Sequence, residues 1–442
     1  MRTIGLDLSI KQPSEAIVAG HDGSFVGSSF KVDETAAGLK ALMERARKGV
    51  ADDGSLRVIM EPTANAWLPI AIYLSHREVT CHLVQSEKAA DLRAFYRKHA
   101  KSDRIDTRVL AKIPFVDEEG LNSLYLPTAE EQALRRLSRQ REKLVSGASA
   151  IKNRLHDLDR LAGWDKVLRS AFGSPFSEAA RSFRRDLYDP WKVRELGIRC
   201  LEKYLVKLMG KKDCRSTAEK LYRASLDIIE LYSPPGKDVS AHLDFEMLCF
   251  EAQIKQERLL KLEELEERVN HQIQRISRGS RSVELARSLT GIGEKGGPVL
   301  ASYVGNPHRF NQNTFRGWHG MIPGSKQSSS KDQKGVSMTK AGPNLVKKFA
   351  YLCADIARQW DPQIARIYWD QMTNKGKHHT QAVCACATHL LDRLLAVLKE
   401  DRPYELRDCA GNPITNTEGK RIIQEKYQVP KEVRQSRRAR NP

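Results

Sequence analysis

The sequence lacks the features that mark membrane-spanning, secreted and zinc-stabilised proteins. It has no run of about 18 apolar residues, and its N-terminus has no basic stretch followed by an apolar one. Its eight cysteines form no CxxC pair, and Cys384 and Cys386 have no histidine partner at zinc-finger spacing. We therefore expect reduced thiols, no membrane span and no secretory signal, as in a soluble, intracellular protein.

Acidic residues are fewer than basic ones. The chain has 74 Lys and Arg against 55 Asp and Glu, which gives a formal net charge of +19 and a pI near 9.5. Lys and Arg that neutralise phosphates supply most of the sequence-independent affinity for nucleic acids. The composition therefore predicts a polyanionic partner.

Four segments differ in composition, and length alone suggests about two to three domains. Residues 1–126 alternate strand-like and helix-like runs, which predicts an α/β domain with a mixed sheet. Residues 127–282 contain two long charged helices of coiled-coil type around a helical insertion at 163–238. Residues 283–400 become compact and mostly helical, and residues 401–442 are expected to form a loosely structured basic tail.

Four carboxylates in the first segment are the best indication of function. Asp7 falls within an apolar, β-rich opening run, and Glu61 ends a second such run. Asp103 and Asp106 are three residues apart at the start of a predicted helix, so they share a face. Carboxylates that converge from two strands and one helix make an oxygen-rich cage that suits Mg²⁺. The sequence therefore predicts a magnesium site.

Each acid also has an ordinary structural interpretation. Asp103 alone would serve as a helix N-cap, and Asp106 alone as the acidic residue of a first turn. Glu61 alone would be a strand-end charge. Asp7 is harder to explain in this way, because a carboxylate within an apolar strand is costly to bury without a cation or donor.

Basic residues surround the acid pair in the segment from 88 to 112. Positive charge beside a carboxylate cage would hold the phosphate backbone near the metal. The residues of this segment that we expect to bind nucleic acid are Lys101, Arg104 and Arg108.

The third segment contains a Gly-Ile-Gly turn between two predicted helices, the pattern of a helix-hairpin-helix. Gly291 and Gly293 would let backbone N–H groups approach a phosphate at a helix N-terminus. A turn with a purely structural role remains the alternative.

A serine- and lysine-rich loop follows. It contains Ser328, Ser329 and Ser330, and its composition alone is that of a flexible, solvated loop. The flanking lysines that we expect to contact nucleic acid are Lys326, Lys331 and Lys340.

These motifs resemble those of the DEDD transposases of bacterial insertion sequences related to the Piv DNA invertase, some of which are bridge-RNA-guided recombinases. The matching segments are GLD at 5–7, EPT at 61–63, KSDRIDTRVLA at 101–111, SLTGIGEKGGPVLASYVGNPHRF, and GMIPGSKQSSSKDQKGVSMTKAGPNLVKK. The chain departs from the family pattern at Ser328-Ser329, where Ser-Gly is usual, and in its helical insertion.

The resemblance implies an RNase H-like (RuvC-like) domain that binds Mg²⁺ through the four acids, and a mostly α transposase domain that supplies a serine nucleophile, Ser328 by position. It further implies cleavage and exchange of target and donor DNA through a covalent phosphoserine. A structured noncoding bridge RNA would read the DNA sequences. The implied assembly is a homodimer that forms a tetramer in the bacterial cytoplasm, at the nucleoid.

Two other functions remain open from the sequence. A metal-dependent hydrolytic nuclease of the junction-resolvase type would use the same acids with water as the nucleophile. A nonenzymatic nucleic-acid scaffold would leave the carboxylates as caps and strand-end charges.

Overall fold

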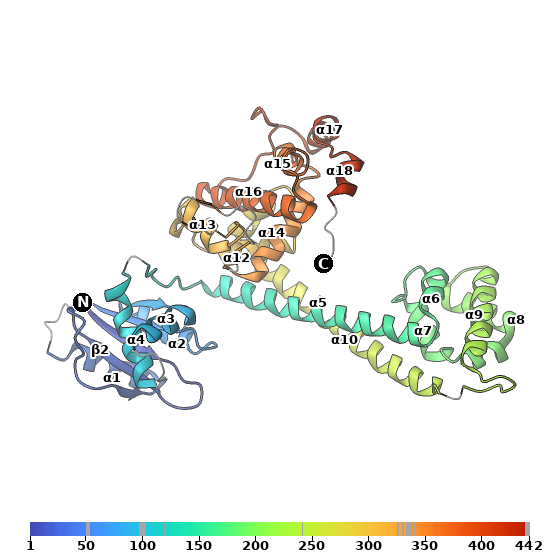
Figure 1. Cartoon of the computed structure of the whole chain (residues 1–442), viewed down its shortest axis with the longest axis horizontal. Coiled ribbons are helices and arrows are strands. Elements are labelled where there is room, and N and C mark those ends of the chain that lie inside the picture. Colours follow the sequence, from blue (N-terminus) through green and yellow to red (C-terminus); the bar gives the residue numbers. More distant parts are fainter. Residues whose placement is uncertain are drawn as a thin grey trace. The chain divides into compact units, whose positions relative to one another are not determined.

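The computed structural model describes residues 1–49, 54–96, 103–118, 120–240, 242–324, 327–328, 331–332, 338–339 and 341–437. It divides into two compact units, Met1–Thr128 and Ala129–Pro442, which are coloured blue to cyan and green-cyan to red in Figure 1.

The first unit is built on a mixed five-stranded sheet, which confirms the predicted α/β, RNase H-like class. The strand order is β3-β2-β1-β4-β5. Strand β1 is antiparallel to β2 and parallel to β4, and β4 is parallel to β5. The strands are β1 (Arg2–Asp7), β2 (Ser14–Ala19), β3 (Phe30–Val32), β4 (Leu56–Met60) and β5 (Thr80–Leu83).

Helices cover both faces of this sheet, because alternate residues of the central strands are apolar on each side. On one face, Ile4 and Leu6 pack in a core with α1 (Ala36–Arg47) and α2 (Trp67–Ser75). On the other face, Ile59 packs with α3 (Ser86–Tyr96) and α4 (Asp103–Val116).

The second unit begins with the predicted coiled-coil pair, which the structure confirms. Helices α5 (Ala129–Leu161) and α10 (Phe245–Ser277) lie side by side and antiparallel (Figure 1). Along the pair, the Lys152 ammonium binds the Glu263 carboxylate at 2.8 Å.

The insertion between these helices is itself helical and has its own core. Its helices are α6 (Asp165–Phe172), α7 (Glu178–Asp186), α8 (Pro190–Met209) and α9 (Arg215–Tyr232). A fully buried ion pair joins it to α5, since Arg184 Nε donates to Asp159 Oδ1 at 2.8 Å.

The C-terminal part of this unit is the predicted mostly helical domain. Helices α11 (Arg281–Ser288) and α12 (Gly296–Val304) form the expected helix-hairpin-helix. The remaining helices up to residue 400 are α13 (Gln312–His319), α14 (Asn344–Ala357), α15 (Pro362–Thr373) and α16 (His379–Glu400).

Helix α16 lies at the centre of this domain and packs on both α14 and α15. Among the described helices it alone is long and apolar enough in composition to cross a membrane, with a mean hydropathy of 1.3. Because 56% of that apolar stretch is buried, the core of a folded domain accounts for its composition.

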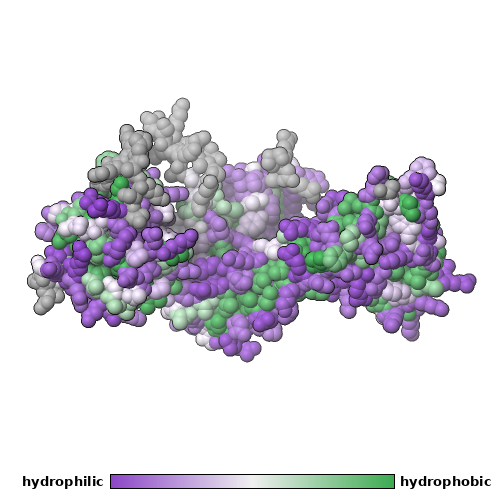
Figure 2. Space-filling model, turned by 90° about the horizontal axis from the view of Figure 1, so that it is seen from below, coloured by the Kyte–Doolittle hydropathy of each residue, from purple (hydrophilic) through white to green (hydrophobic). Residues whose placement is uncertain are grey.

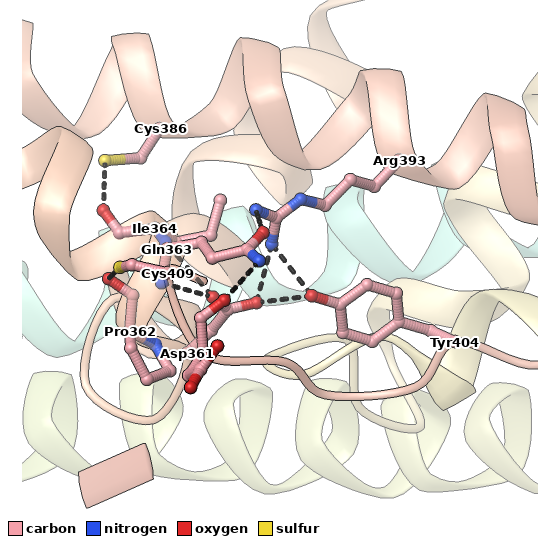
Figure 3. Close-up of polar contacts among 9 residues, drawn as sticks. Asp361, Pro362, Gln363, Ile364, Cys386, Arg393, Tyr404 and Cys409 are labelled. Carbon is pink, nitrogen blue, oxygen red and sulfur yellow. Dashed lines mark hydrogen bonds and ion pairs between the residues drawn. The ribbon is translucent and has the colours of Figure 1, made fainter. Parts of the chain in front are cut away.

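The expectation of a loosely structured tail after residue 400 is wrong for the described residues up to 437. This extension forms α17 (Asn416–Lys426) and α18 (Lys431–Ser436), and both helices pack on α15. The extension is held in place by a buried polar contact that the composition does not indicate (Figure 3). Asp361 Oδ2 accepts hydrogen bonds from Arg393 at 2.6 Å and from Tyr404 at 2.8 Å. That contact fixes the start of the extension to α15 and α16.

Candidate active site

The two strand-borne acids lie at adjacent strand ends. Asp7 is the last residue of β1, and Glu61 directly follows β4. The parallel register pairs Leu6 with Met60, so the next residue of each chain segment is an acid. The parallel pairing thus brings together two acids that are 54 positions apart in the sequence.

Both acids belong to the α4 face of the sheet. Asp7 stands two residues after Gly5, and Glu61 stands two residues after Ile59, which packs against α4. Side chains two apart in a strand share a face. The acids therefore lie on the side of the sheet that α4 covers.

Gly5 allows the close approach of α4 to β1. A Cβ atom at this position would lie 2.1 Å from the Thr107 carbonyl oxygen and 2.6 Å from the Ala111 nitrogen. No side chain fits there, so the helix that carries Asp106 packs directly on the strand that carries Asp7. In the sequence, the signal for this role is the place of Gly5 two residues before Asp7 in GLD.

Arg93 is a site residue that sequence reasoning counted only as part of the basic segment. Its Nε donates a hydrogen bond to Asp106 Oδ1 at 2.5 Å, and its Nη2 lies 4.0 Å from Glu61 Oε1. The three side chains are only 11–21% exposed. One guanidinium on α3 therefore brings together two of the predicted catalytic acids.

Glu15 is a further acid on this face, because the antiparallel register places it opposite Asp7. Burial acts to raise the pKa of Glu15, but hydrogen bonds from Ser29 and Lys31 outweigh it and lower that pKa. Lys31 Nζ lies 3.0 Å from Glu15 Oε2, so this carboxylate already has a counter-charge.

The donors fit a divalent metal in their chemistry. Carboxylate oxygens are the ligands that Mg²⁺ prefers, and Asp7, Glu61 and Asp106 converge on one end of the sheet. Asp103 begins α4, but its side chain lies outside the described part of the structure. Among the described residues, no three acids, histidines or cysteines lie close enough together to hold a metal, and the Arg93 guanidinium meets two of the acids.

The basic residues of α4 form a ridge at four-residue spacing. The exposed Arg104 donates a long hydrogen bond of 3.4 Å to Ser29, and the Arg108 guanidinium lies 5.4 Å from the centre of the Phe25 ring. The charge of Arg104 helps to lower the pKa of Glu15, but neither arginine forms an ion pair with a described side chain, so both can meet a phosphate backbone. Lys101 lies outside the described residues.

The backbone of the serine-rich segment contains a short antiparallel ladder. Strand β6 (Gln327–Ser328) pairs with β7 (Lys331–Asp332), with Ser328 opposite Lys331. The side chains of both residues lie outside the described part, as do Lys326, Ser329, Ser330 and Lys340 altogether.

The stem of this segment is fixed to the domain core. Thr339 N–H donates to the Ile322 carbonyl at 3.0 Å, and Thr339 Oγ1 donates to the Gly320 carbonyl at 3.1 Å. From α16, Thr388 Oγ1 donates to the Met321 carbonyl at 2.6 Å. The backbone on both sides of the serines is therefore tied to ordered elements.

His319, at the end of α13, also supports this stem and was missed from the sequence. It is fully buried, and its Nδ1 accepts a hydrogen bond from the Met321 N–H at 3.0 Å. Burial lowers the pKa of His319 to about 4, so the ring is neutral at pH 7. Its Nε2 has no partner among the described atoms.

The two glycines of the Gly-Ile-Gly turn differ. Gly291 has a φ of +91°, and a Cβ atom there would lie 2.4 Å from the Cys353 carbonyl oxygen. A Cβ atom on Gly293 would meet nothing within 4 Å. Gly291 is therefore required for packing on α14, whereas Gly293 leaves open backbone for a ligand.

Two transposase family models match this chain. A transposase model named for the DEDD residues of IS110 matches residues 4–160, and a second, described as "Transposase IS116/IS110/IS902 family", matches residues 283–369. The chain belongs to the IS110 family of DEDD transposases. The first match covers the acid-bearing sheet and nearly all of α5. The second runs from the helix-hairpin-helix into α15 and includes the serine segment.

Two curated relatives are similar to this IS110-family transposase over most of their length. An uncharacterised 43.6 kDa protein of insertion element IS110 from Streptomyces coelicolor is 25% identical over 374 residues, which is 82% of this chain and 87% of the relative. An uncharacterised 44.8 kDa protein of insertion element IS116 from Streptomyces clavuligerus is 22% identical over 414 residues, covering 94% and 98%.

Proposed function

We propose that this IS110-family transposase exchanges DNA strands through a covalent phosphoserine, with Mg²⁺ held by Asp7, Glu61, Asp103 and Asp106. The supporting observation is the convergence of Asp7 and Glu61 at adjacent strand ends with Asp106 on the helix that packs against them. Independent roles as caps and strand-end charges would not require these acids to lie at the same end of one face of the sheet.

The acid site would position phosphate through several of its own residues. When bound, Mg²⁺ would relieve negative charge at the phosphorus and polarise the leaving oxygen. Gly5 keeps α4 against β1, which fixes the distance between the strand-borne and helix-borne acids. Arg104 and Arg108, on the exposed ridge of α4, would hold the flanking phosphates.

Ser328 is the proposed nucleophile. Its Oγ would attack the scissile phosphorus, so that a new Oγ–P bond forms while one bridging P–O bond of the DNA breaks. The serine proton passes to a base, and the departing sugar oxygen takes up a proton. Attack by the hydroxyl of another strand reverses these changes, which conserves the bond energy for joining. Lys331, opposite Ser328 in the ladder, would offset the added negative charge.

Recognition and assembly form a separate part of the proposal. We propose that a bridge RNA pairs with target and donor DNA while the protein binds backbone and shape, as in other guided effectors. The net charge of +19 suits two polyanionic partners. We further propose that the protein assembles as a homodimer that forms a tetramer, at the nucleoid of the bacterial cytoplasm.

A denaturing gel tests the covalent step. The full-length protein is incubated with Mg²⁺, labelled DNA and the element's RNA, and a protein–DNA band is expected. Ser328→Ala and Asp106→Asn should each abolish the band while nucleic-acid binding persists. Asp117→Asn is the matched control, because it removes an exposed carboxylate just after α4.

Other outcomes have distinct meanings. An adduct that maps to Ser329 or Ser330 keeps the mechanism and changes the nucleophile. Cleavage without an adduct in all three serine variants would favour the hydrolytic nuclease. Normal cleavage by Asp106→Asn would contradict the acid site itself.

A further inference from the structure

A polar cleft of about 640 Å³ opens in the C-terminal part of the second unit, and its lining includes none of the four acids and no residue of the serine segment. Its walls come from α15, α16 and the extension after residue 400. The residues on which its chemistry depends are Arg366, Trp369, Lys375, His389, Arg393 and Tyr427. The volume is that of a small-ligand site.

Gln363 and Arg393, which both line the cleft, belong to a hydrogen-bond network that is already formed (Figure 3). Arg393 reaches from α16 and donates through Nη2 to Gln363 Oε1 at 2.7 Å and through Nη1 to Asp361 Oδ2 at 2.6 Å. The Gln363 amide in turn donates to the Asp408 carbonyl of the extension at 2.7 Å. These bonds order three segments before any ligand arrives, which lowers the entropic cost of binding.

The charges of the cleft favour an anion. Asp370 binds Lys375 at 2.8 Å and Asp361 binds Arg393, so two cations are already paired. Arg366 is exposed and has no ion pair with any side chain that the structure describes.

His389 lies among charges of both signs. Burial lowers the pKa of His389, the nearby charges of Arg316, Arg393 and Lys375 lower it further, and Asp392 opposes them. Arg316, Arg393 and Lys375 each have a carboxylate partner, so Arg366 is the cation of the cleft that is left for an arriving phosphate among the described side chains.

Aromatic rings border the same cleft. Trp369 of α15 and Tyr427 of the extension are half-buried, with ring centroids 6.4 Å apart at an interplanar angle of 65°. An aromatic ring beside cationic side chains is the combination that binds single-stranded nucleic acid, because bases stack and phosphates pair. An apolar ligand would leave the cations and amides of the cleft unpaired.

We propose that this cleft binds one nucleotide of a single strand, with its base against Trp369 and its phosphate beside Arg366 and His389. This site goes beyond the proposed acid and serine chemistry and does not depend on it. A duplex does not suit the cleft, because paired bases do not present their faces to a side chain. RNA and DNA strands share the recognised chemistry.

Binding of labelled ten-nucleotide strands, oligo-dT and oligo-rU, to the full-length protein without Mg²⁺ tests this site. Arg366→Gln should weaken binding several-fold and reduce the slope of log K against log salt by about 0.7, the value for one phosphate of a single strand. Trp369→Leu should weaken binding on the order of tenfold with the salt slope unchanged, because it removes stacking and no charge. Arg199→Gln on α8 is the matched control and should have no effect, since it also removes one exposed, unpaired arginine.

Strands that contain 5-iodouracil provide a second readout, since they should crosslink to Trp369 or Tyr427. A preference for oligo-rU or for oligo-dT shows whether the natural ligand is an RNA or a DNA strand, and either preference supports the site. If Arg366→Gln binds as Arg199→Gln does and the crosslinks map elsewhere, the proposal is overturned. If Arg366→Gln and Trp369→Leu weaken binding to a duplex as much as binding to a single strand, the single-strand assignment is overturned. Because Arg366 is exposed, its variant remains informative even if Trp369→Leu fails to fold.

Discussion

The Arg93 side chain balances the negative charge of two of the acids in the site. It holds Asp106 at 2.5 Å and lies 4.0 Å from Glu61, so its charge offsets two carboxylates that a metal would otherwise neutralise. Nothing in the order of residues along the chain pairs Arg93 with Glu61, which lies 32 positions earlier. The contact depends on how α3 docks on the sheet.

Removal of Arg93 should make this unit more dependent on metal. Arg93→Gln leaves Glu61 and Asp106 with like charges and no other ion pair among the described side chains, which should cost about 3 kcal/mol in metal-free buffer. Mg²⁺ should then raise the melting temperature more than it does in the wild type. Thermal unfolding with and without Mg²⁺ measures this.

Lys88→Gln provides the control for this measurement. It breaks an ion pair with Asp117 between the same two segments, but that pair is about half exposed and contributes about 0–1 kcal/mol. If Mg²⁺ raises the melting temperature equally in the wild type and in Arg93→Gln, Arg93 and the metal do not share these carboxylates.

His319 gives stability a specific dependence on pH. Its folded pKa of about 4 lies below the ordinary value of 6.5, so the unfolded chain binds the proton more readily. The contribution of this group is complete above pH 6.5 and is lost as the pH falls toward 4, by about 3 kcal/mol. His319→Asn keeps an acceptor for the Met321 N–H and should flatten this part of the stability curve.

Denaturant unfolding at several pH values tests this prediction. His271→Asn is the control, because His271 is exposed on α10. Identical acid dependence in His319→Asn and the wild type would contradict the assignment.

At the scale of elements, close contacts decide which glycines matter. Gly5 permits α4 to touch β1, and Gly291 permits the hairpin to touch α14. The sequence indicates a strand, a turn and a helix at these places, because period and turn residues are local signals. It does not indicate which glycine lies under another backbone.

The two glycines of the hairpin should therefore respond differently to alanine. Gly291→Ala combines a left-handed φ with a clash against Cys353 and should cost at least about 2 kcal/mol. Gly293→Ala has space for the methyl group and should change stability by less than about 0.5 kcal/mol. If its backbone N–H meets a phosphate, Gly293→Ala should still weaken DNA binding.

Unfolding and DNA-binding measurements on the same pair of variants separate these roles. Loss of stability in Gly293→Ala, or none in Gly291→Ala, would contradict the structural assignment. If Gly293→Ala binds DNA with unchanged affinity, Gly293 does not contact the nucleic acid.

At the scale of the whole molecule, the excess of positive charge predicts steep salt dependence. The log of nucleic-acid affinity should fall linearly with log salt, by about 0.9 for each duplex phosphate contacted. Arg104→Gln should reduce that slope by about 1 and weaken binding equally for unrelated sequences.

Lys40→Gln is the control for this effect, because Lys40 is exposed on α1, across the sheet from α4. Binding that does not change with salt, or an effect of Arg104→Gln on one DNA sequence only, would contradict a backbone contact.

The classes of element and the order of the acids follow from local features of the sequence. Strand period, helix period and the charged coiled-coil helices are local patterns, so the mixed sheet, the helical arms and the helix-hairpin-helix could be predicted. Three contacts become visible only in the folded chain: Arg93 binds Asp106, α4 packs on Gly5, and Tyr404 anchors the extension to Asp361. These contacts join residues distant in the chain, and their energy comes from burial and hydrogen bonds that exist only after packing.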